Sequence, residues 1–204
     1  MLTLHGVGDP LMHAGVLEVI SAARASGVGL VHLRTDGLSD AFDAGKLVAS
    51  GLDVLSVDVL AASPETYRVM TGVDRYEEVR ARVEGALAAR GAVAGLPGMW
   101  VVPRVTRCDE VYGDLEGFYD GWLMAGCSAV IDPIASAEGG SVRLPESTRI
   151  RGFPLPSLAR ERVSREFVAV RSDGSVAGGD SVSGELSAVL TAVREEARRS
   201  LAVA

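Results

Sequence analysis

The sequence predicts an α/β fold with a parallel sheet, open or barrel-like, and three observations support this prediction. Strand-like and helix-like segments alternate through the first two-thirds of the 204 residues, which is typical of parallel strands joined by right-handed crossovers. The strand-like segments are apolar along their length, as expected for parallel strands buried on both faces. The chain is also 48% apolar, enough for the core of one domain with a small appendage.

Five strand segments and the helices between them are expected in a regular order. The strands are expected at residues 2–5, 29–34, 52–59, 99–105 and 127–131. The helices are expected at residues 11–25, 41–50, from 63 onward, 76–90 and 115–125. Gly27, Gly51 and Gly91 each follow a helix and suit its end, while Ser63 before Pro64 suits a helix start. Pro103 makes the fourth strand imperfect, because proline cannot donate a ladder hydrogen bond.

The last third of the chain has a different pattern, which places a domain boundary between residues 135 and 136. Residues 135–164 are rich in Gly, Pro, Ser and Arg and predict an irregular connector. Residues 165–170, the turn at 172–175 and a short strand at Val176 predict a β-hairpin. A C-terminal helix is expected over residues 185–201.

Composition excludes several classes of function. The formal net charge of −7 repels a phosphate backbone, so nucleic-acid binding is not expected. No apolar run approaches the ~20 residues of a membrane helix, and no signal peptide is recognisable at the N-terminus. Two cysteines give no disulfide framework and suit a reducing compartment. We therefore expect a soluble cytoplasmic protein with no nucleic-acid or membrane partner.

The loop after the first strand is the first candidate ligand site, because sites in parallel α/β folds collect at the carboxyl ends of strands. Gly6 and Gly8 let backbone N–H groups approach a ligand, and the Asp9 carboxylate can take an ammonium group. The alternative is a tight turn that needs glycine only for its geometry, and for a lone motif of this kind that alternative is favoured about two to one.

Polar residues at the other strand ends complete the candidate site. Asp58 can accept two sugar hydroxyls or cap the next helix, and these alternatives are evenly weighted. Arg34, Arg104 and Arg107 are candidate substrate-binding residues; Arg104 and Arg107 can hold a carboxylate, although solvated strand-end arginines are at least as frequent. The three histidines share no ligand spacing, so no metal site is expected. No catalytic residue is assigned.

Four motifs in order resemble the radical S-adenosylmethionine (radical SAM) superfamily over about residues 2–134. Residues 2–13, LTLHGVGDPLMH, resemble its second strand and its "GGEPLLHP" loop. Residues 31–38, VHLRTDGL, and 50–59, SGLDVLSVDV, resemble its third and fourth strands. Residues 63–67, SPETY, with Gly72 resemble the "TPETY…G" that follows. Residues 167–176, FVAVRSDGSV, resemble the opening of the SPASM extension, which holds auxiliary clusters in related enzymes that often modify peptides.

The resemblance implies a fold, a ligand and two domains. It implies a partial TIM-like (βα) barrel of about five parallel strands, the family's second to sixth, in residues 1–135, and a degenerate SPASM-like extension, a small β-hairpin plus C-terminal helix, in residues 136–204. It also implies that S-adenosylmethionine binds through Gly6, Gly8, Asp9 and Asp58.

The departures from the family concern its iron–sulfur chemistry. The sequence has no C-x-x-x-C-x-x-C loop, and only Cys108 and Cys127 are present, so we expect no 4Fe–4S cluster ligated by this chain. Gly179 and Val182 stand where the SPASM cysteine and aspartate are expected. Asp9 replaces the family's Glu.

Three functions follow from these departures. The favoured one is a degenerate, cluster-free protein that is a non-catalytic binding or partner subunit. The alternatives are a binder of S-adenosylmethionine or another nucleotide with non-radical chemistry, and a fragment of an active radical SAM/SPASM peptide-modifying enzyme.

The segment at residues 2–5 is expected to be an apolar edge strand, because the counterpart of the family's first strand is missing. The unpaired backbone groups and apolar side chains of such an edge strand are costly to expose to solvent. We expect a homodimer, a partner protein or the C-terminal segment to cover it, and the partner can be a peptide or a full-length radical SAM protein.

Overall fold

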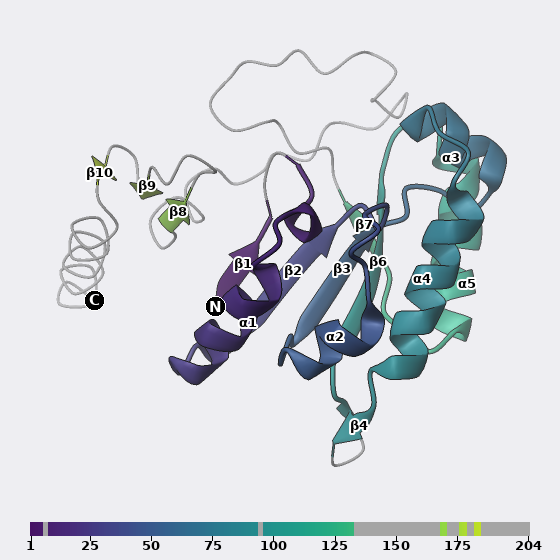
Figure 1. The fold of residues 1–204 in the computed structure, drawn as a ribbon. Coiled ribbons are helices and arrows are strands. Elements are labelled where there is room, and N and C mark those ends of the chain that lie inside the picture. Colours follow the sequence, from purple (N-terminus) through teal and green to yellow (C-terminus); the bar gives the residue numbers. More distant parts are fainter. Residues whose placement is uncertain (6–7, 94–95, 133–167, 171–175, 179–181, 185–204) are drawn as a thin grey trace, which may run out of the picture. The chain divides into compact units, whose positions relative to one another are not determined.

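The computed structural model describes most of the first two-thirds of the chain and three short strands after it. The described residues are 1–5, 8–93, 96–132, 168–170, 176–178 and 182–184. The chain forms two units, Met1–Pro154 and Leu155–Ala204, and each is described here by itself (Figure 1). The predicted boundary between residues 135 and 136 and the predicted connector at 135–164 lie outside the described residues and stay predictions.

A five-stranded sheet forms the centre of the first unit. Its strands are β1 (Leu2–Leu4), β2 (Val31–Thr35), β3 (Val54–Asp58), β6 (Trp100–Thr106) and β7 (Val130–Asp132). They lie in the order β1-β2-β3-β6-β7, and every neighbouring pair is parallel. Because spatial order follows chain order, all connections run in one direction around the sheet, as in a (βα) barrel. The predicted α/β fold, a partial TIM-like barrel of five parallel strands, is confirmed.

Helices connect these strands. They are α1 (Val16–Ala25), α2 (Ala44–Ala49), α3 (Pro64–Thr71), α4 (Tyr76–Ala89) and α5 (Leu115–Met124), with short 3-10 turns η1 (Pro10–Met12) and η2 (Tyr112–Asp114). In Figure 1, α1 and α2 lie in front of the sheet, and α4 and α5 lie beside it. Within the described part of the chain, no helix is long and apolar enough to span a membrane.

The helix boundaries follow the capping residues read from the sequence. The Ser63 hydroxyl accepts a hydrogen bond from the Thr66 N–H at 3.3 Å, and Pro64 occupies the first turn of α3. Gly27, Gly51 and Gly91 have φ of 82°, 84° and 64°, the left-handed conformation that ends a helix at little cost for glycine.

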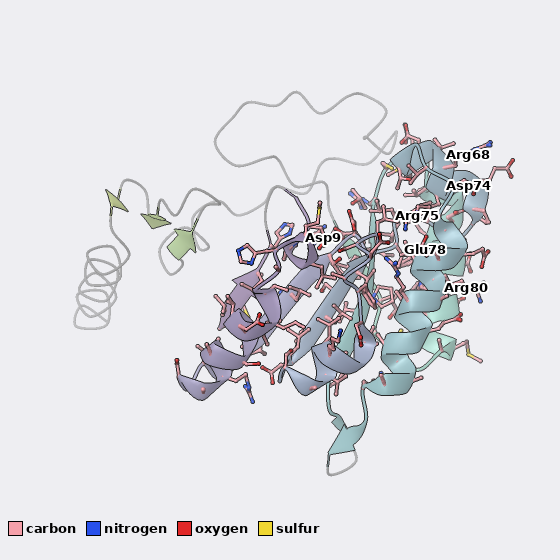
Figure 2. The ribbon with its side chains drawn as sticks, in the orientation of Figure 1. Asp9, Arg68, Asp74, Arg75, Glu78 and Arg80 are labelled. Atoms are coloured by element: carbon pink, nitrogen blue, oxygen red, sulfur yellow. The ribbon has the colours of Figure 1, made fainter. Side chains whose placement is uncertain are left out.

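The outer side of α4 carries ion pairs between neighbouring turns. Arg80 and Glu84 lie 3.0 Å apart, and Arg75 and Glu78 lie 2.6 Å apart. Figure 2 shows Arg75, Glu78 and Arg80 along this helix, well away from Asp9 in the loop before η1. Pairs of this exposed kind contribute little to stability, so they mark the solvent side of the helix layer.

The expectation that the strands are apolar and buried on both faces is wrong for β2 and β6. Along β2, Val31, Leu33 and Thr35 are buried, whereas His32 and Arg34 between them are half-buried. β6 alternates in the same way. The buried strand residues share one core cluster with helix residues, including Ile20, Leu47, Val79, Val83 and Phe118. One face of the sheet therefore packs under the helices, and polar side chains stand on the other face.

The first predicted helix also begins later than expected. It was expected from residue 11, but η1 comes first and α1 starts at Val16. The Asp9 carboxylate accepts the Leu11 N–H at 2.8 Å, and His13 Nδ1 accepts the Gly15 N–H at 3.1 Å. These local bonds satisfy backbone donors in a turn and so delay the helix. The strands β4 (Ala92–Val93) and β5 (Leu96–Pro97), an antiparallel pair between α4 and β6, were not predicted.

The second unit contains the predicted hairpin and one further strand. β8 (Val168–Val170) pairs antiparallel with β9 (Val176–Gly178), with Val170 opposite Val176, so the hairpin is confirmed. β10 (Val182–Gly184) pairs with β9 and makes a three-stranded sheet that was not predicted. The predicted C-terminal helix at residues 185–201 lies outside the described residues.

Candidate functional site

A cavity of about 210 Å³ opens where β1, β2 and β3 end. Its lining consists of His5, Gly8, Asp9, Arg34, Thr35, Asp36 and Asp58. The strands are parallel and in register, so their carboxyl ends deliver these side chains to one edge of the sheet. Four of the seven predicted site residues, Gly8, Asp9, Arg34 and Asp58, thus meet at one place, while Gly6 lies outside the described residues.

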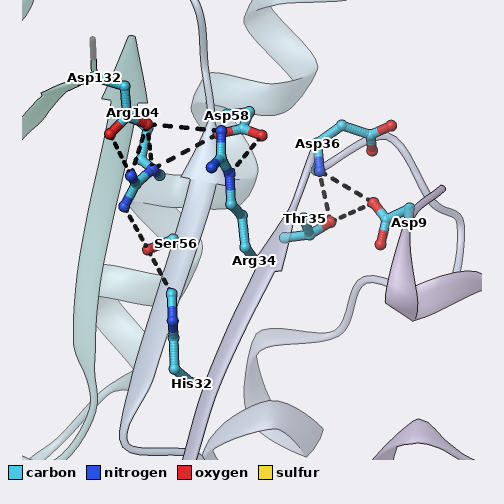
Figure 3. Close-up of polar contacts among 10 residues, drawn as sticks. Asp9, His32, Arg34, Thr35, Asp36, Ser56, Asp58, Arg104 and Asp132 are labelled. Carbon is cyan, nitrogen blue, oxygen red and sulfur yellow. Dashed lines mark hydrogen bonds and ion pairs between the residues drawn. The ribbon is translucent and has the colours of Figure 1, made fainter. Parts of the chain in front are cut away.

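Asp9 is tied into the loop that it belongs to. One carboxylate oxygen accepts the Leu11 N–H at 2.8 Å. The other accepts the Thr35 hydroxyl and, at 3.1 Å, the Asp36 N–H (Figure 3). A carboxylate has about four acceptor positions, and three are used here. These bonds hold a tight turn, which was one of the two alternatives for this loop.

Arg34 and Asp58 form an ion pair between neighbouring strands. Arg34 Nε lies 2.9 Å from each carboxylate oxygen of Asp58. Arg34 lies opposite Ser56 in the β2–β3 register, and Asp58 is two residues further on the same face of β3. Their side chains are 23% and 20% exposed, which leaves both open to the cavity while their charges offset each other.

A second pair, Arg104 with Asp132, lies next to the first. Arg104 Nε and Nη2 donate to Asp132 Oδ2 at 2.9 and 2.6 Å (Figure 3). The two pairs are linked, because Arg34 Nη2 lies 3.6 Å from Asp132 Oδ2 and Arg104 Nε lies 3.9 Å from Asp58 Oδ1. Asp132 was missed from the sequence, although it stands directly after the apolar run 127–131 and the same strand-end rule points to it.

His32 and Ser56 extend this polar network into the sheet. His32 Nε2 lies 2.9 Å from Ser56 Oγ, and Arg104 Nη1 donates to the same oxygen at 3.5 Å. Ser56 is 1% exposed, so its hydroxyl relies on these partners. Burial, and next the charge of Arg104, with smaller contributions from His5 and Arg34, lowers the pKa of His32. Its imidazole is therefore neutral at pH 7.

Asp36 is the third carboxylate that lines the cavity. Burial raises the pKa of Asp36, and a side-chain hydrogen bond with Asp9 and the charges of Asp9 and Asp58 act in the same direction. Its Oδ1 accepts the Leu38 N–H at 2.8 Å, and Thr35 Oγ1 accepts the Gly37 N–H at 2.9 Å, so the loop after β2 is held by side-chain bonds. Three carboxylates in one lining favour positive or neutral ligand groups.

Arg107 does not join the site in the described part of the chain. Its backbone N–H donates to the Asp132 carbonyl at 2.9 Å, but its side chain is not part of the cavity lining. Its predicted role in holding a carboxylate therefore receives no support from the geometry.

The cysteines are placed as core residues. Cys108 and Cys127 are 2% and 6% exposed. Burial raises the pKa of both thiols, which disfavours the thiolates that an iron–sulfur cluster needs. Cys108 Sγ lies 3.6 Å from Met70 Sδ, and Cys127 Sγ lies 3.2 Å from the Trp122 carbonyl. The thiols of this chain do not fit a cluster, and the described residues contain no group of three or more His, Cys, Asp or Glu placed to hold a metal ion.

The fold and the site together define a class of protein. Parallel strands in consecutive order, with helices over one face and polar side chains gathered at the carboxyl ends, are typical of (βα)-barrel proteins that bind small ligands.

Several curated proteins are similar in sequence to part of the chain. A GTP 3',8-cyclase from Heliobacterium modesticaldum is 34% identical over 83 residues, which are 40% of this chain and 25% of that protein. Probable GTP 3',8-cyclases from Metallosphaera sedula and Methanothermobacter marburgensis are 34% and 32% identical over 79 and 82 residues, covering 39% and 40% of this chain and 25% and 27% of theirs. GTP 3',8-cyclases are radical SAM enzymes, so these matches support the resemblance to the radical SAM superfamily that the motifs predicted.

The extent of these matches is limited. The chain spans about a quarter of the length of these relatives, and the matches do not show a SPASM extension. No family model matches the chain. A domain of pyruvate-formate lyase-activating enzyme from Bacteroides vulgatus is 14% identical with a TM-score of 0.43, covering 56% of this chain and 65% of that one, and adds nothing to the sequence matches.

Proposed function

We propose that this chain is a cluster-free relative of radical SAM enzymes that binds a small polar ligand at the carboxyl end of its sheet and serves as a non-catalytic binding or partner subunit. The main support is the cavity at the ends of β1, β2 and β3, which gathers four predicted site residues while both cysteines are buried in the core. Its ligand class is S-adenosylmethionine or a related nucleoside.

The chemistry of the lining supports a ligand of this class. Asp9 lines the cavity with a carboxylate that can attract an ammonium group, and Asp58 can accept hydroxyl groups beside its pair with Arg34. The cavity of about 210 Å³ is smaller than the ~300–1,000 Å³ of typical small-molecule sites. It would therefore hold one polar end of the ligand, while the remainder lies over the polar face of the sheet.

Calorimetry with S-adenosylmethionine tests this proposal. We expect the full chain, free of iron, to bind the ligand, and Asp58→Asn to weaken binding about tenfold because a charged acceptor is lost. Asp43→Asn is the matched control: it removes the same charge at the start of α2, where the side chain accepts the Lys46 N–H and where asparagine caps equally well. No heat at millimolar ligand would refute the proposal.

The absence of a cluster is tested separately by reconstitution. After anaerobic incubation with iron and sulfide, we expect substoichiometric iron and unchanged ligand affinity, because the buried thiols are poor ligands. One cluster per chain would overturn the cluster-free assignment.

A second candidate is a segment of an active radical SAM enzyme, and the limited coverage of the relatives favours it. The matches reach 25–27% of the relatives' length. This candidate predicts a three-cysteine motif encoded in frame upstream, which sequencing of the surrounding gene would reveal. Under it, the ligand site described above belongs to a larger catalytic barrel.

The partner is expected at β1. Within the described residues β1 pairs only with β2, and Leu2 and Leu4 are half-buried. An edge strand with unpaired N–H and C=O groups is a ready template for another strand. A homodimer or a heterologous partner in the cytoplasm is proposed to cover it, and a monodisperse monomer with fast amide exchange at residues 2–4 would argue against this.

A further inference from the structure

The charges around the cavity are unequal in number and closely paired. Four carboxylates belong to the cavity and the adjoining network: Asp9, Asp36, Asp58 and Asp132. The guanidinium groups of this network are those of Arg34 and Arg104. His32 adds no positive charge, because burial and the Arg104 charge lower the pKa of His32.

Both arginines are held by carboxylates of the chain itself. Arg34 donates through Nε to both carboxylate oxygens of Asp58, and Arg104 donates through Nε and Nη2 to the Asp132 carboxylate. These are charge-assisted bonds in a half-buried setting, which makes them stronger than pairs at the surface. A phosphate that approached either arginine would compete with a carboxylate for the guanidinium and would also meet the negative charge of its neighbours.

Arg34 also has N–H groups that are not bonded to Asp58 and can donate to a ligand. Arg34 lines the cavity, and Nη1 has no hydrogen bond to the described residues. A guanidinium whose charge is offset still offers N–H groups, and these suit a carbonyl, a ring nitrogen or a hydroxyl oxygen. The site is therefore equipped to bind polar ligands without attracting anions.

We propose that Asp58 and Asp132 determine specificity by offsetting Arg34 and Arg104, so that the site accepts uncharged or cationic nucleoside-like ligands and excludes phosphorylated ones. This inference rests on the proposed small-ligand site and names its substrate class. Asp132 is a positioning residue, because it acts through Arg104.

The test is a gain of anion binding. Asp132→Asn in the full chain keeps the shape of the side chain and frees the charge of Arg104. Calorimetry with inorganic pyrophosphate at low ionic strength should show no binding to the natural chain and measurable binding to Asp132→Asn, an increase in affinity of about tenfold or more. Asp58→Asn should produce the same gain through Arg34.

Two controls locate the effect. Asp43→Asn changes the net charge equally at a distant exposed site and should leave pyrophosphate unbound. Adding Arg104→Gln to Asp132→Asn should abolish the gained binding. Circular dichroism identifies any variant that fails to fold, and Asp58→Asn decides the question if Asp132→Asn does not fold.

The results that would contradict this inference differ from those that would contradict the proposed function. Equal pyrophosphate binding by the natural chain and Asp132→Asn, gain in the Asp43→Asn control, or no gain in a folded variant would overturn it. If the natural chain does not bind S-adenosylmethionine, the proposed function fails. A gain of pyrophosphate binding in Asp132→Asn would then still show that Asp132 offsets the positive charge of Arg104.

Discussion

The two faces of the central sheet differ in the polarity and packing of their side chains. The face under the helices is apolar and closely packed, with Leu33, Leu55, Val57 and Val105 fully buried. The opposite face carries the network of His32, Arg34, Ser56, Asp58, Arg104 and Asp132. Alternate residues of the same strands supply both faces, so the packed core and the polar network use different side chains of the same strands.

The largest effect is expected on the apolar face. Leu33→Ala removes a side chain with 0% exposure and leaves a cavity, so the free energy of unfolding should fall by about 2–5 kcal/mol. Urea denaturation followed by circular dichroism measures this loss. Val102→Ala, at a half-buried position of β6, should cost clearly less, and equal losses would contradict the distinction between the faces.

The polar face should show a coupling of intermediate size. A double-mutant cycle on Arg104→Gln and Asp132→Asn should give about 1–2 kcal/mol in the free energy of unfolding, because the pair is half-buried and makes several hydrogen bonds. The exposed pair Arg80–Glu84 provides the comparison and should give about 0.3–0.5 kcal/mol. Indistinguishable values would mean that the strand-end network is no stronger than a surface pair.

A smaller effect is expected from pH. The folded-state pKa of His32 lies below its ordinary value of 6.5, so the unfolded chain binds more protons as the pH falls. The stability that depends on a neutral His32 is fully present above pH 6.5, the ordinary pKa. It is lost as the pH falls from there toward the folded-state pKa. Urea midpoints between pH 7.5 and 5.5 should decline less for His32→Gln than for the natural chain. Identical slopes would show that His32 is not linked to folding.

The smallest effect is expected at the helix caps, away from both faces. Ser63→Ala removes the acceptor for the Thr66 N–H and should cost about 1 kcal/mol of unfolding free energy. Asp43→Asn should change stability by a few tenths of a kcal/mol, since asparagine keeps the acceptor. Thermal melts of the two variants, compared directly, measure this difference.

The sequence predicted the order of elements well because local signals specify it. Ser63 with Pro64, and the glycines after the helices, fixed boundaries that the structure reproduces within a few residues. The start of α1 could not be predicted in this way. The Asp9 carboxylate also bonds Thr35 and Asp36, and a contact 26 residues away leaves no local trace in the sequence.

Several residues of the candidate site were predicted from the sequence, but the ion pairs that they form were not. The strand-end rule found Asp9, Arg34, Asp58 and Arg104, yet it treated the arginines as available for a substrate. Their partners depend on strand register, which places Asp58 beside Arg34 and brings Arg104 to Asp132. Alternation along β2 and β6 was also overlooked, because short apolar runs give little indication of which face is covered.

Ligand binding without iron is the central claim, and one measurement tests it most directly. Calorimetry of the full chain with S-adenosylmethionine, with iron content determined on the same sample, should show binding in protein that contains no iron. Absence of heat at millimolar ligand, or binding that appears only after a stoichiometric cluster has been reconstituted, would contradict the account.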